Sequence, residues 1–431
     1  MWAGTFRVCP GKERVGADHV VRGEGVRWFR AFLGEDVNAP VRHPRIPSGI
    51  GARTMGLRLS KPGDVAATVI PSVGCPMGCN FCATSAMFGG KGKFINFYET
   101  GDELFEVMNG IAADMKVESF FVMDENFLLH RKRALRLLEL MERHGKSWSL
   151  YVFSSANVLR SYTPEQLVGL GISWVWMGLE GRKSRYQKLA GADTHGLVRE
   201  LQALGISILG STIIGLEEHT PGNIDEVIEH AITHDTEFHQ FMLYTPVPGT
   251  ALFEEHRANG TLIDPDCKDP SDIHGQLKFA HRHPNLPPGS ETGFLLRAFR
   301  RDFEVNGPSL LRVARRNLAG WKKFRRHPDR RVRRRFHREA RPLRVEYPAV
   351  LWAMRRWYRS DAAMYRKVDR LLREVIREFG LQARLSASAL GRVVFKRMMA
   401  EAVCPPGDVV EPPTFYEVTA AGVRSSQLLR T

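Results

Sequence analysis

The sequence has few cysteines and no long apolar run. Six cysteines occur among 431 residues, and three of them are scattered along the chain. That number excludes the disulfide framework typical of small secreted domains. No run of eighteen apolar residues appears, and the first ten residues lack the apolar core of a signal peptide. We therefore expect no membrane-spanning helix and a reducing, cytoplasmic setting.

The composition is that of a globular protein with an unevenly distributed positive charge. Hydrophobic residues make up 43% of the chain and charged residues 25%, and the formal net charge is +15. Residues 291–340 hold sixteen Lys and Arg against five Asp and Glu, so most of the excess lies there. The length suits two or three domains with sizeable cores.

Three of the cysteines lie within eight residues. Cys75, Cys79 and Cys82 occur in the sequence C-P-M-G-C-N-F-C, whose proline and glycine disfavour a regular helix. Thiolates gathered in such a loop bind a soft metal centre, and an iron–sulfur cluster is the leading candidate. A zinc knuckle with a distant fourth ligand and unrelated thiols are the alternatives. The other cysteines, Cys9, Cys267 and Cys404, are interpreted as inert thiols.

Apolar runs and amphipathic segments alternate from about residue 64 to residue 276. The predicted strands are Val65–Val73, Glu118–Asp124, Trp148–Ser154, Ser173–Leu179, Ser207–Ile214 and Phe238–Thr245. The predicted helices between them are Gly101–Lys116, His130–His144, Thr163–Leu170, Leu197–Leu204 and Asn223–His234. Near-continuous apolar strands alternating with helices predict an α/β fold with a parallel sheet buried on both faces.

The cysteine loop resembles the cluster loop of the radical SAM superfamily, because the spacing is C-x3-C-x2-C and Phe81 precedes the last cysteine. The resemblance implies a [4Fe–4S] cluster held by Cys75, Cys79 and Cys82, with S-adenosylmethionine (SAM) on the fourth iron. It also implies cleavage of SAM to a 5′-deoxyadenosyl radical, an electron donor such as flavodoxin or ferredoxin, and a partial (β/α)6 TIM-like barrel. The six predicted strands match that barrel.

In parallel barrels, functional residues gather where the strands end. The sequence M-D-E-N-F after the second predicted strand resembles an element of cobalamin-type radical SAM proteins. It implies that Asp124 and Glu125 face the SAM amino group. The alternative is a helix N-cap formed by Asp124 or Asn126.

Later strand ends supply further candidates. Ser155, Asn157 and Glu180 carry groups suited to the polar parts of SAM, although the two former residues also suit a simple turn. The segment around the fifth strand resembles the family's adenine-contacting strand. The resemblance implies an adenine wall made of Ser211, Ile213 and Gly215, with Phe81 beside the ring. No residue is assigned as a catalytic acid or base.

Three regions are expected. They are an N-terminal segment (residues 1–62), the radical SAM core (residues 63–285) and a basic helical region (residues 286–431). Within the first, Gly16–Arg30 is predicted to form a short strand, a glycine turn and an amphipathic helix, and it resembles the end of a cobalamin-binding domain; an ordinary linker helix is the alternative. The loop D-x-H-x-x-G that supplies a cobalt ligand in many such proteins occurs nowhere in the chain. A truncated gene model, cobalamin supplied by another chain, and use of the adenosyl radical alone remain open.

The predicted function is that of a radical SAM enzyme that abstracts hydrogen from a small-molecule or lipid substrate, with methylation or rearrangement as the outcome. The amphipathic, arginine-rich region leaves other interpretations open. These are an RNA-modifying radical SAM enzyme, and a non-enzymatic, metal-stapled protein that binds nucleic acid or an anionic membrane surface. A solvated arginine-rich face that packs beside the barrel is the simplest interpretation of that region.

Overall fold

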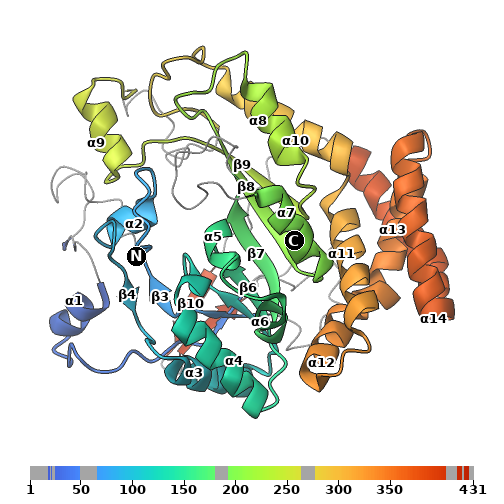
Figure 1. The fold of residues 1–431 in the computed structure, drawn as a ribbon, viewed down its shortest axis with the longest axis horizontal. Coiled ribbons are helices and arrows are strands. Elements are labelled where there is room, and N and C mark those ends of the chain that lie inside the picture. The colour runs from blue at the N-terminus through green and yellow to red at the C-terminus, as the bar shows by residue number, and fades with distance from the viewer. Residues whose placement is uncertain are drawn as a thin grey trace.

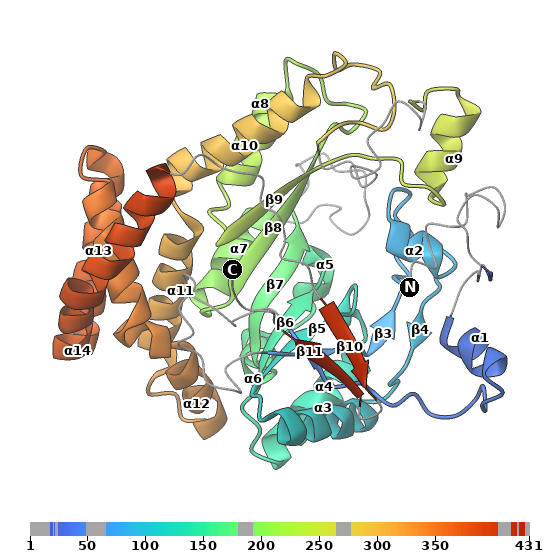
Figure 2. The same cartoon turned by 180° about the vertical axis from the view of Figure 1, so that it is seen from behind.

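The fold is built on one curved, mostly parallel sheet. A computed structural model describes residues 18–19, 21, 25–48, 66–179, 193–263, 277–403, 415–419 and 422–426. The order of the seven strands is β1-β2-β5-β6-β7-β8-β9, seen from its two sides in Figures 1 and 2. These strands are β1 (Ile46–Pro47), β2 (Ala67–Val69), β5 (Ser119–Val122), β6 (Ser149–Phe153), β7 (Ile172–Gly178), β8 (Ser207–Ile214) and β9 (Phe238–Leu243).

Helices connect the successive parallel strands. They are α3 (Gly101–Met115), α4 (Arg131–Arg143) with the 3-10 helix η3 (Phe127–Leu129), α5 (Ala156–Leu159), α6 (Pro164–Gly169), α7 (Thr194–Ala203) and α8 (Ile224–Ile232). A capping box starts α3, where Thr100 accepts from the backbone N–H of Glu103 and the Glu103 side chain bonds back to Thr100. The same device, formed by Thr163 and Gln166, starts α6.

The predicted α/β fold with six parallel strands is confirmed. Within the seven-stranded sheet, neighbouring strands pair in parallel from β2 through β5, β6, β7 and β8 to β9. In that sheet only the pairing of β1 with β2 is antiparallel. The first predicted strand, Val65–Val73, is broken by Pro71, whose carbonyl accepts from the backbone N–H groups of Phe97 and Tyr98. After the break, β3 (Ser72–Val73) pairs instead with β4 (Ile95–Asn96). The chain therefore leaves the main sheet just before the cysteines.

The N-terminal segment adds to the edge of this sheet through β1, which pairs with β2. Before it lies α1 (Gly25–Phe32), an amphipathic helix with no buried residue. Its apolar side chains Val26, Phe29 and Phe32 are all exposed. The predicted helix of the segment Gly16–Arg30 is thus present. Most of the strand and turn predicted before it lie outside the described residues.

The chain after the parallel sheet is mostly helical, as predicted for residues 286–431. Its helices are α9 (Ala251–Ala258), α10 (Glu291–Asn306), α11 (Ser309–Phe324), α12 (Arg330–Glu339), η7 (Arg341–Arg344), α13 (Glu346–Trp357) and α14 (Ala362–Val403), followed by the strands β10 (Phe415–Thr419) and β11 (Gly422–Ser426). Gly380, with φ of 64°, interrupts α14. Helices α11 to α14 stand on one side of the sheet, opposite α2 (Ala83–Met87) and α9 (Figures 1 and 2). No helix in the described ranges is both long and apolar enough to cross a membrane.

Many arginines of α11 and α12 contact the end of the sheet where the parallel strands begin. Arg316 donates to the carboxylate of Glu237 (2.9 Å) and to the carbonyl of Gln202 (2.7 Å). Arg335 donates to the carbonyls of Val168 and Ile172. We call this set the arginine layer; it consists of Arg312, Arg316, Arg331, Arg334, Arg335 and Arg338.

Several partners of the arginine layer are carbonyls at helix C-termini. Val168 and Gly169 end α6, and Gln202 lies in the last turn of α7. The carbonyls of Val168 and Gln202 each accept a backbone N–H, from Gly171 and Gly205, and a guanidinium adds a further bond and offsets the negative partial charge of the helix end. Much of the positive charge of residues 291–340 is therefore used to hold helices to the barrel.

Candidate functional site

The cysteine loop follows β3 and leads into α2, and its shape depends on two glycines. Gly74 and Gly78 have φ values of 88° and 68°, a region that side chains disfavour. A Cβ at Gly78 would lie 2.5 Å from the Cβ of Lys91, so only glycine allows this approach. The N–H of Gly92 donates to the carbonyl of Pro76 (2.8 Å) and closes the loop.

The three thiols of this loop border one cavity. Cys75, Cys79 and Cys82 are half-buried, and none of them forms a disulfide. Burial raises the pKa of Cys75 to about 11, and the neighbouring Cys82 and Cys79 act in the same direction. Three thiolates this close repel one another unless cations lie between them. The donor set therefore fits a soft, positively charged metal centre, as the sequence predicts.

The cavity lies where the parallel strands end, and its volume is about 480 Å³. Such a volume is in the range of small-molecule sites. Besides the three cysteines, it is lined by Met77, Phe81, Ala83, Glu125, Asn126, Phe153, Ser154, Ser155, Trp176, Met177, Gly178, Ser211, Ile213, Met242, Leu243, Tyr244, Thr245 and Val247. Five different strand ends thus contribute to the same space as the cysteine loop.

The acidic pair after β5 is divided between two environments. Asp124 is 3% exposed and forms an ion pair with Arg133 at 2.6 Å. It also accepts from the hydroxyl of Ser72 and from the backbone N–H of Asn126. Its carboxylate is thus held by three donors within the protein. Asp124 does not line the cavity, whereas Glu125 does.

Glu125 is the acidic side chain that borders the cysteines. Burial raises its pKa, the Asp124 carboxylate adds to this shift, and the Thr84 hydroxyl opposes it. Among the described residues no cation pairs with Glu125. Glu125 nonetheless remains exposed, so its carboxylate can reach a ligand, and a positively charged ligand would stabilise its charged form.

Polar groups after β6 form a small network beside Glu125. The hydroxyl of Ser154 donates to the Asn126 amide oxygen (3.1 Å), and the Asn126 amide nitrogen donates to the hydroxyl of Ser155 (3.3 Å). All three side chains are buried and border the cavity. Asn157, the other candidate at this strand end, lies in α5 with an exposed side chain and does not line the cavity.

Of the three candidates on and just after β8, two line the cavity and one does not. Ser211 and Ile213 line the cavity, and Phe81 packs with Ile213 and Tyr244. Gly215 does not line the cavity, and it ends the strand with φ of 85°. A Cβ there would lie 2.4 Å from the ring of Phe279. Glu180 lies outside the described residues.

The cysteine loop is tied to the end of the last parallel strand. The amide of Asn80 donates to the hydroxyl of Tyr244 (3.1 Å), and the backbone N–H of Leu252 donates to the carbonyl of Asn80 (3.0 Å). The rings of Phe81 and Tyr244 meet edge to face, with centroids 5.7 Å apart. The proline-containing segment after β9 therefore fixes the position of the loop.

Sequence reasoning missed the apolar wall of the cavity. Phe153 and Trp176, at the ends of β6 and β7, stack with ring centroids 4.8 Å apart, and Met242 lies nearby on the cavity surface. The sequence pattern could have predicted this wall. Side chains alternate along a strand, and the last inward-facing positions of a parallel sheet border its mouth. The role of Arg133 has no such signal, since only the fold brings its guanidinium to Asp124.

Comparison with known proteins agrees with this geometry. Residues 69–231 match the family described as "Radical SAM superfamily". An uncharacterized methyltransferase of Pyrococcus horikoshii is 25% identical over 218 residues, which are 49% of this chain and 47% of the relative.

Two methyltransferases of Chlorobaculum tepidum are also similar. Bacteriochlorophyllide d C-12(1)-methyltransferase is 27% identical, covering 47% of this chain and 45% of the relative. Bacteriochlorophyllide d C-8(2)-methyltransferase is 26% identical, covering 49% of each chain. The chain thus spans about half the length of the curated relatives it matches.

Proposed function

We propose that this chain, whose residues 69–231 match the radical SAM superfamily, cleaves SAM reductively and uses the resulting radical to modify an apolar small molecule. One observation carries the proposal. Three cysteine thiols, the Glu125 carboxylate and the Asn126–Ser154–Ser155 network border the same cavity at the ends of the strands. A cluster, a cationic amino acid group and a ribose all have suitable partners there.

Cys75, Cys79 and Cys82 would hold three irons of a [4Fe–4S] cluster, which leaves the fourth iron for an outside ligand. When bound, this cluster supplies the electron that cleaves SAM into methionine and the 5′-deoxyadenosyl radical. The electron itself would come from a flavodoxin- or ferredoxin-like donor. The half-buried position of the thiols limits the access of water to the centre.

The other residues of the cavity would bind and orient SAM. Glu125 would attract the amino group, because a cation stabilises the charged form of a carboxylate whose pKa is raised. Ser155 and its partners Asn126 and Ser154 would bond the polar groups of SAM. Ser211 and Ile213 would face the adenine with Phe81 beside them.

The remaining sequence candidates have lesser roles in this proposal. Asp124 would position Glu125 through its bonds to Arg133 and Asn126, without touching SAM. Gly215 would shape the end of β8. Asn157 is exposed, and Glu180 lies outside the described residues, so neither enters the proposal.

The apolar wall favours a flat or lipid-like substrate. Phe153, Trp176 and Met242 line the cavity from three strands. Apolar walls bury apolar ligands and keep water from a reactive radical. The relatives from Chlorobaculum tepidum are named as methyltransferases of a bacteriochlorophyllide. We therefore propose methylation, and as the alternative rearrangement, of a natural product or lipid.

Cobalamin is the second cofactor of this proposal, as a methyl carrier. One feature supports the idea that another domain or chain brings cobalamin. The helix α1 has an apolar face formed by the exposed side chains of Val26, Phe29 and Phe32, and such a face suits contact with another domain or chain. Adding methylcobalamin during turnover tests the idea. Methyl transfer that requires it supports cobalamin, and equal product without it contradicts this part of the proposal.

An RNA substrate is the alternative that a specific observation favours. A hollow of about 370 Å³ is lined by Glu118, Arg334, His337, Arg338, Arg341 and Arg344, and five of these six side chains can carry positive charge. Phosphate contacts of that kind weaken steeply with salt. The binding of RNA and the binding of anionic vesicles are each measured at two salt concentrations, which shows whether the hollow binds RNA or a membrane surface. Failure of both to bind at low salt rejects the alternative.

The first experiment tests the chemistry. The chain is reconstituted anaerobically with iron and sulfide, reduced with dithionite and supplied with SAM. We expect about four irons per chain, the broad visible absorption of a cluster, and 5′-deoxyadenosine as a product. A colourless zinc protein, or a cluster that binds SAM and leaves it intact, contradicts the proposal.

Matched variants identify the ligands. Cys79→Ala should lose both the cluster and the cleavage of SAM, whereas Cys267→Ala, whose cysteine lies far from the loop in sequence, should retain both. Cleavage retained by Cys79→Ala refutes the ligand assignment.

The second experiment addresses the substrate. SAM carrying a deuterated methyl group is incubated with the reconstituted protein and a lipid and pigment extract, and the products are analysed by mass spectrometry. Transfer of the deuterated methyl group to an apolar compound supports methylation. Consumption of a compound without label supports rearrangement, and labelling of RNA alone contradicts the apolar substrate.

A further inference from the structure

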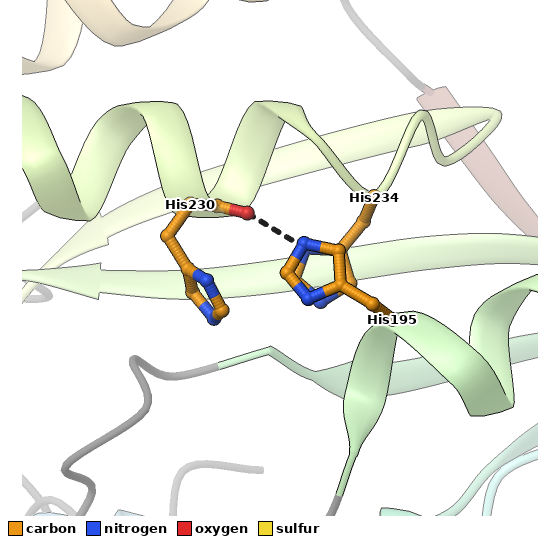
Figure 3. Close-up of side chains that lie close together, drawn as sticks. All are labelled: His195, His230 and His234. Carbon is orange, nitrogen blue, oxygen red and sulfur yellow. Dashed lines mark hydrogen bonds between the residues drawn. The ribbon is translucent and has the colours of Figure 1, made fainter.

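A second group of potential metal ligands lies away from the cysteine loop, between α7 and α8. His195 comes from the first turn of α7, His230 lies in the last turn of α8, and His234 lies two residues after the end of α8 (Figure 3). One ligand atom from each ring lies within 4.8 Å of the other two. The turn that ends α8 thus places two imidazoles beside the one from α7, which suits the three to a shared ion.

We propose that His195, His230 and His234 bind a divalent ion of the zinc class and thereby join α7 to α8. Imidazole nitrogens suit zinc, copper, nickel and cobalt, whereas magnesium and calcium prefer oxygen. The three residues supply three neutral nitrogen ligands. A fourth position would remain for water or an outside ligand, as in many zinc sites with three protein ligands.

The hydrogen bonds around the cluster orient two of the rings for this purpose. The Nδ1 of His234 lies 2.9 Å from the carbonyl of His230, so Nδ1 carries the proton and Nε2 presents a lone pair. That Nε2 accepts from the hydroxyl of Thr194 at 2.9 Å, and a bound ion would take the place of this donor. An imidazole whose other nitrogen donates to a backbone carbonyl is the usual arrangement for a metal ligand.

The tautomer of His195 follows from two further hydrogen bonds. The hydroxyl of Thr233 donates to the carbonyl of His230 (2.8 Å), so its oxygen accepts from the Nε2 of His195 (2.8 Å). The lone pair of His195 is therefore on Nδ1. Hydrogen bonds within the protein thus fix the tautomer of both rings, with the lone pair on Nε2 of His234 and on Nδ1 of His195.

The cluster is buried on one side and open to solvent on the other. His234 is the buried member. His195 and His230 are only partly buried, which gives an ion access from solvent.

The rings need only a modest rearrangement to bind. His195 and His234 are stacked with centroids 3.6 Å apart and an interplanar angle of 17°. Two nitrogens bound tetrahedrally at about 2.0–2.1 Å from zinc lie roughly 3.3 Å apart. Since the ligand atoms already lie within 4.8 Å, rotation of the two partly buried rings can bring them together.

The proposal does not depend on the function of the cysteine loop, so its test uses a readout other than SAM cleavage. The full chain is first loaded with its iron–sulfur cluster, which occupies the thiols, and is then equilibrated with Zn²⁺. We expect one zinc per chain and a higher melting temperature, because an ion that binds only the folded state stabilises it. The zinc absorption edge should show nitrogen or oxygen at about 2.0–2.1 Å and no sulfur at about 2.3 Å.

Variants localise the ion. His195→Ala and His230→Ala change partly buried residues and should each weaken zinc binding by more than about tenfold. His144→Ala, which removes an exposed imidazole at the end of α4, should bind zinc like the wild type. Circular dichroism establishes that each variant is folded. Zinc retained by both histidine variants, sulfur in the zinc shell, or no zinc bound to the wild type overturns the proposal.

Discussion

The two ends of the parallel sheet use ionisable groups in opposite ways. Where the strands end, Glu125 borders the cavity with no cationic partner among the described residues, and the pKa of Cys75 is raised to about 11. Where the strands begin, the buried carboxylate of Glu237 is met by Arg316 and by the backbone N–H of Ile208. Charge is thus incompletely matched within the protein at one end and closely matched at the other.

The difference indicates which end performs chemistry. A group that lacks a partner in the folded protein weakens the fold and gains most from binding a ligand. A group whose partners are all within the protein contributes to the fold and gains nothing from a ligand. The same division separates Asp124, which is held by Arg133, from its neighbour Glu125.

The largest loss of stability is expected where the arginine layer meets Glu237. Arg316→Met would leave that carboxylate buried without its cation, at a cost of about 3–5 kcal/mol in the free energy of unfolding. Arg315→Met is the control, because Arg315 pairs with Asp235 at an exposed site and should contribute about 0–1 kcal/mol. Urea unfolding measures both values, and equal losses would contradict a role for the buried pair.

A smaller loss is expected at Asp124. Arg133→Met removes an ion pair whose side chains are 2% and 3% exposed, but Ser72 and the N–H of Asn126 still donate to the carboxylate. We expect a loss of about 2–3 kcal/mol. Arg136→Met, on the exposed side of the same helix, should stay within about 1 kcal/mol of the wild type. If the two substitutions lower the free energy of unfolding equally, the distinction between the buried and the exposed ion pair is contradicted.

Glu125→Gln should stabilise the folded protein, whereas the two substitutions of buried arginines should destabilise it. Burial raises the pKa of Glu125 above its ordinary value of 4.5, so the folded protein keeps a proton there that the unfolded chain has lost. The contribution of Glu125 to stability therefore falls as the pH rises above 4.5 and levels off above the folded-state pKa. Since glutamine does not titrate, the variant should become more stable than the wild type over that window. Unfolding measured between pH 4.5 and 8 checks the trend, and a variant less stable at pH 8 contradicts it.

The same substitution should weaken SAM binding. Loss of the carboxylate removes one charge-assisted contact to the amino group, and we expect roughly a tenfold increase in Kd. Equilibrium dialysis with the reconstituted protein measures it. Unchanged affinity would show that Glu125 does not face the amino group, whatever its effect on stability.

Much of the fold could be predicted from the sequence, because it rests on local patterns. The apolar run Ser207–Ile214 coincides with β8, and the amphipathic run Gly101–Lys116 ends one residue beyond α3. The first strand was predicted too long, since an apolar run continues through Pro71 while its pairing does not. Spacing alone also placed the three cysteines in one loop.

The rest could not be predicted, because it depends on partners distant in the sequence. Net charge identified residues 291–340 as basic, but Arg316 meets Glu237 across 79 positions. The pair Asp124 and Glu125 looks alike in sequence, and only the packing of α4 assigns one of them to Arg133. His195, likewise, comes close to His230 and His234 only when α7 lies beside α8.

The most direct test of this account is the amount of 5′-deoxyadenosine formed per folded molecule by two variants that change opposite ends of the sheet. We predict none from Cys79→Ala, because its cluster is lost, and the wild-type amount from Arg316→Met, once unfolded protein has been discounted. Cleavage by folded Cys79→Ala, or its absence from folded, cluster-loaded Arg316→Met, would contradict the division between the two ends.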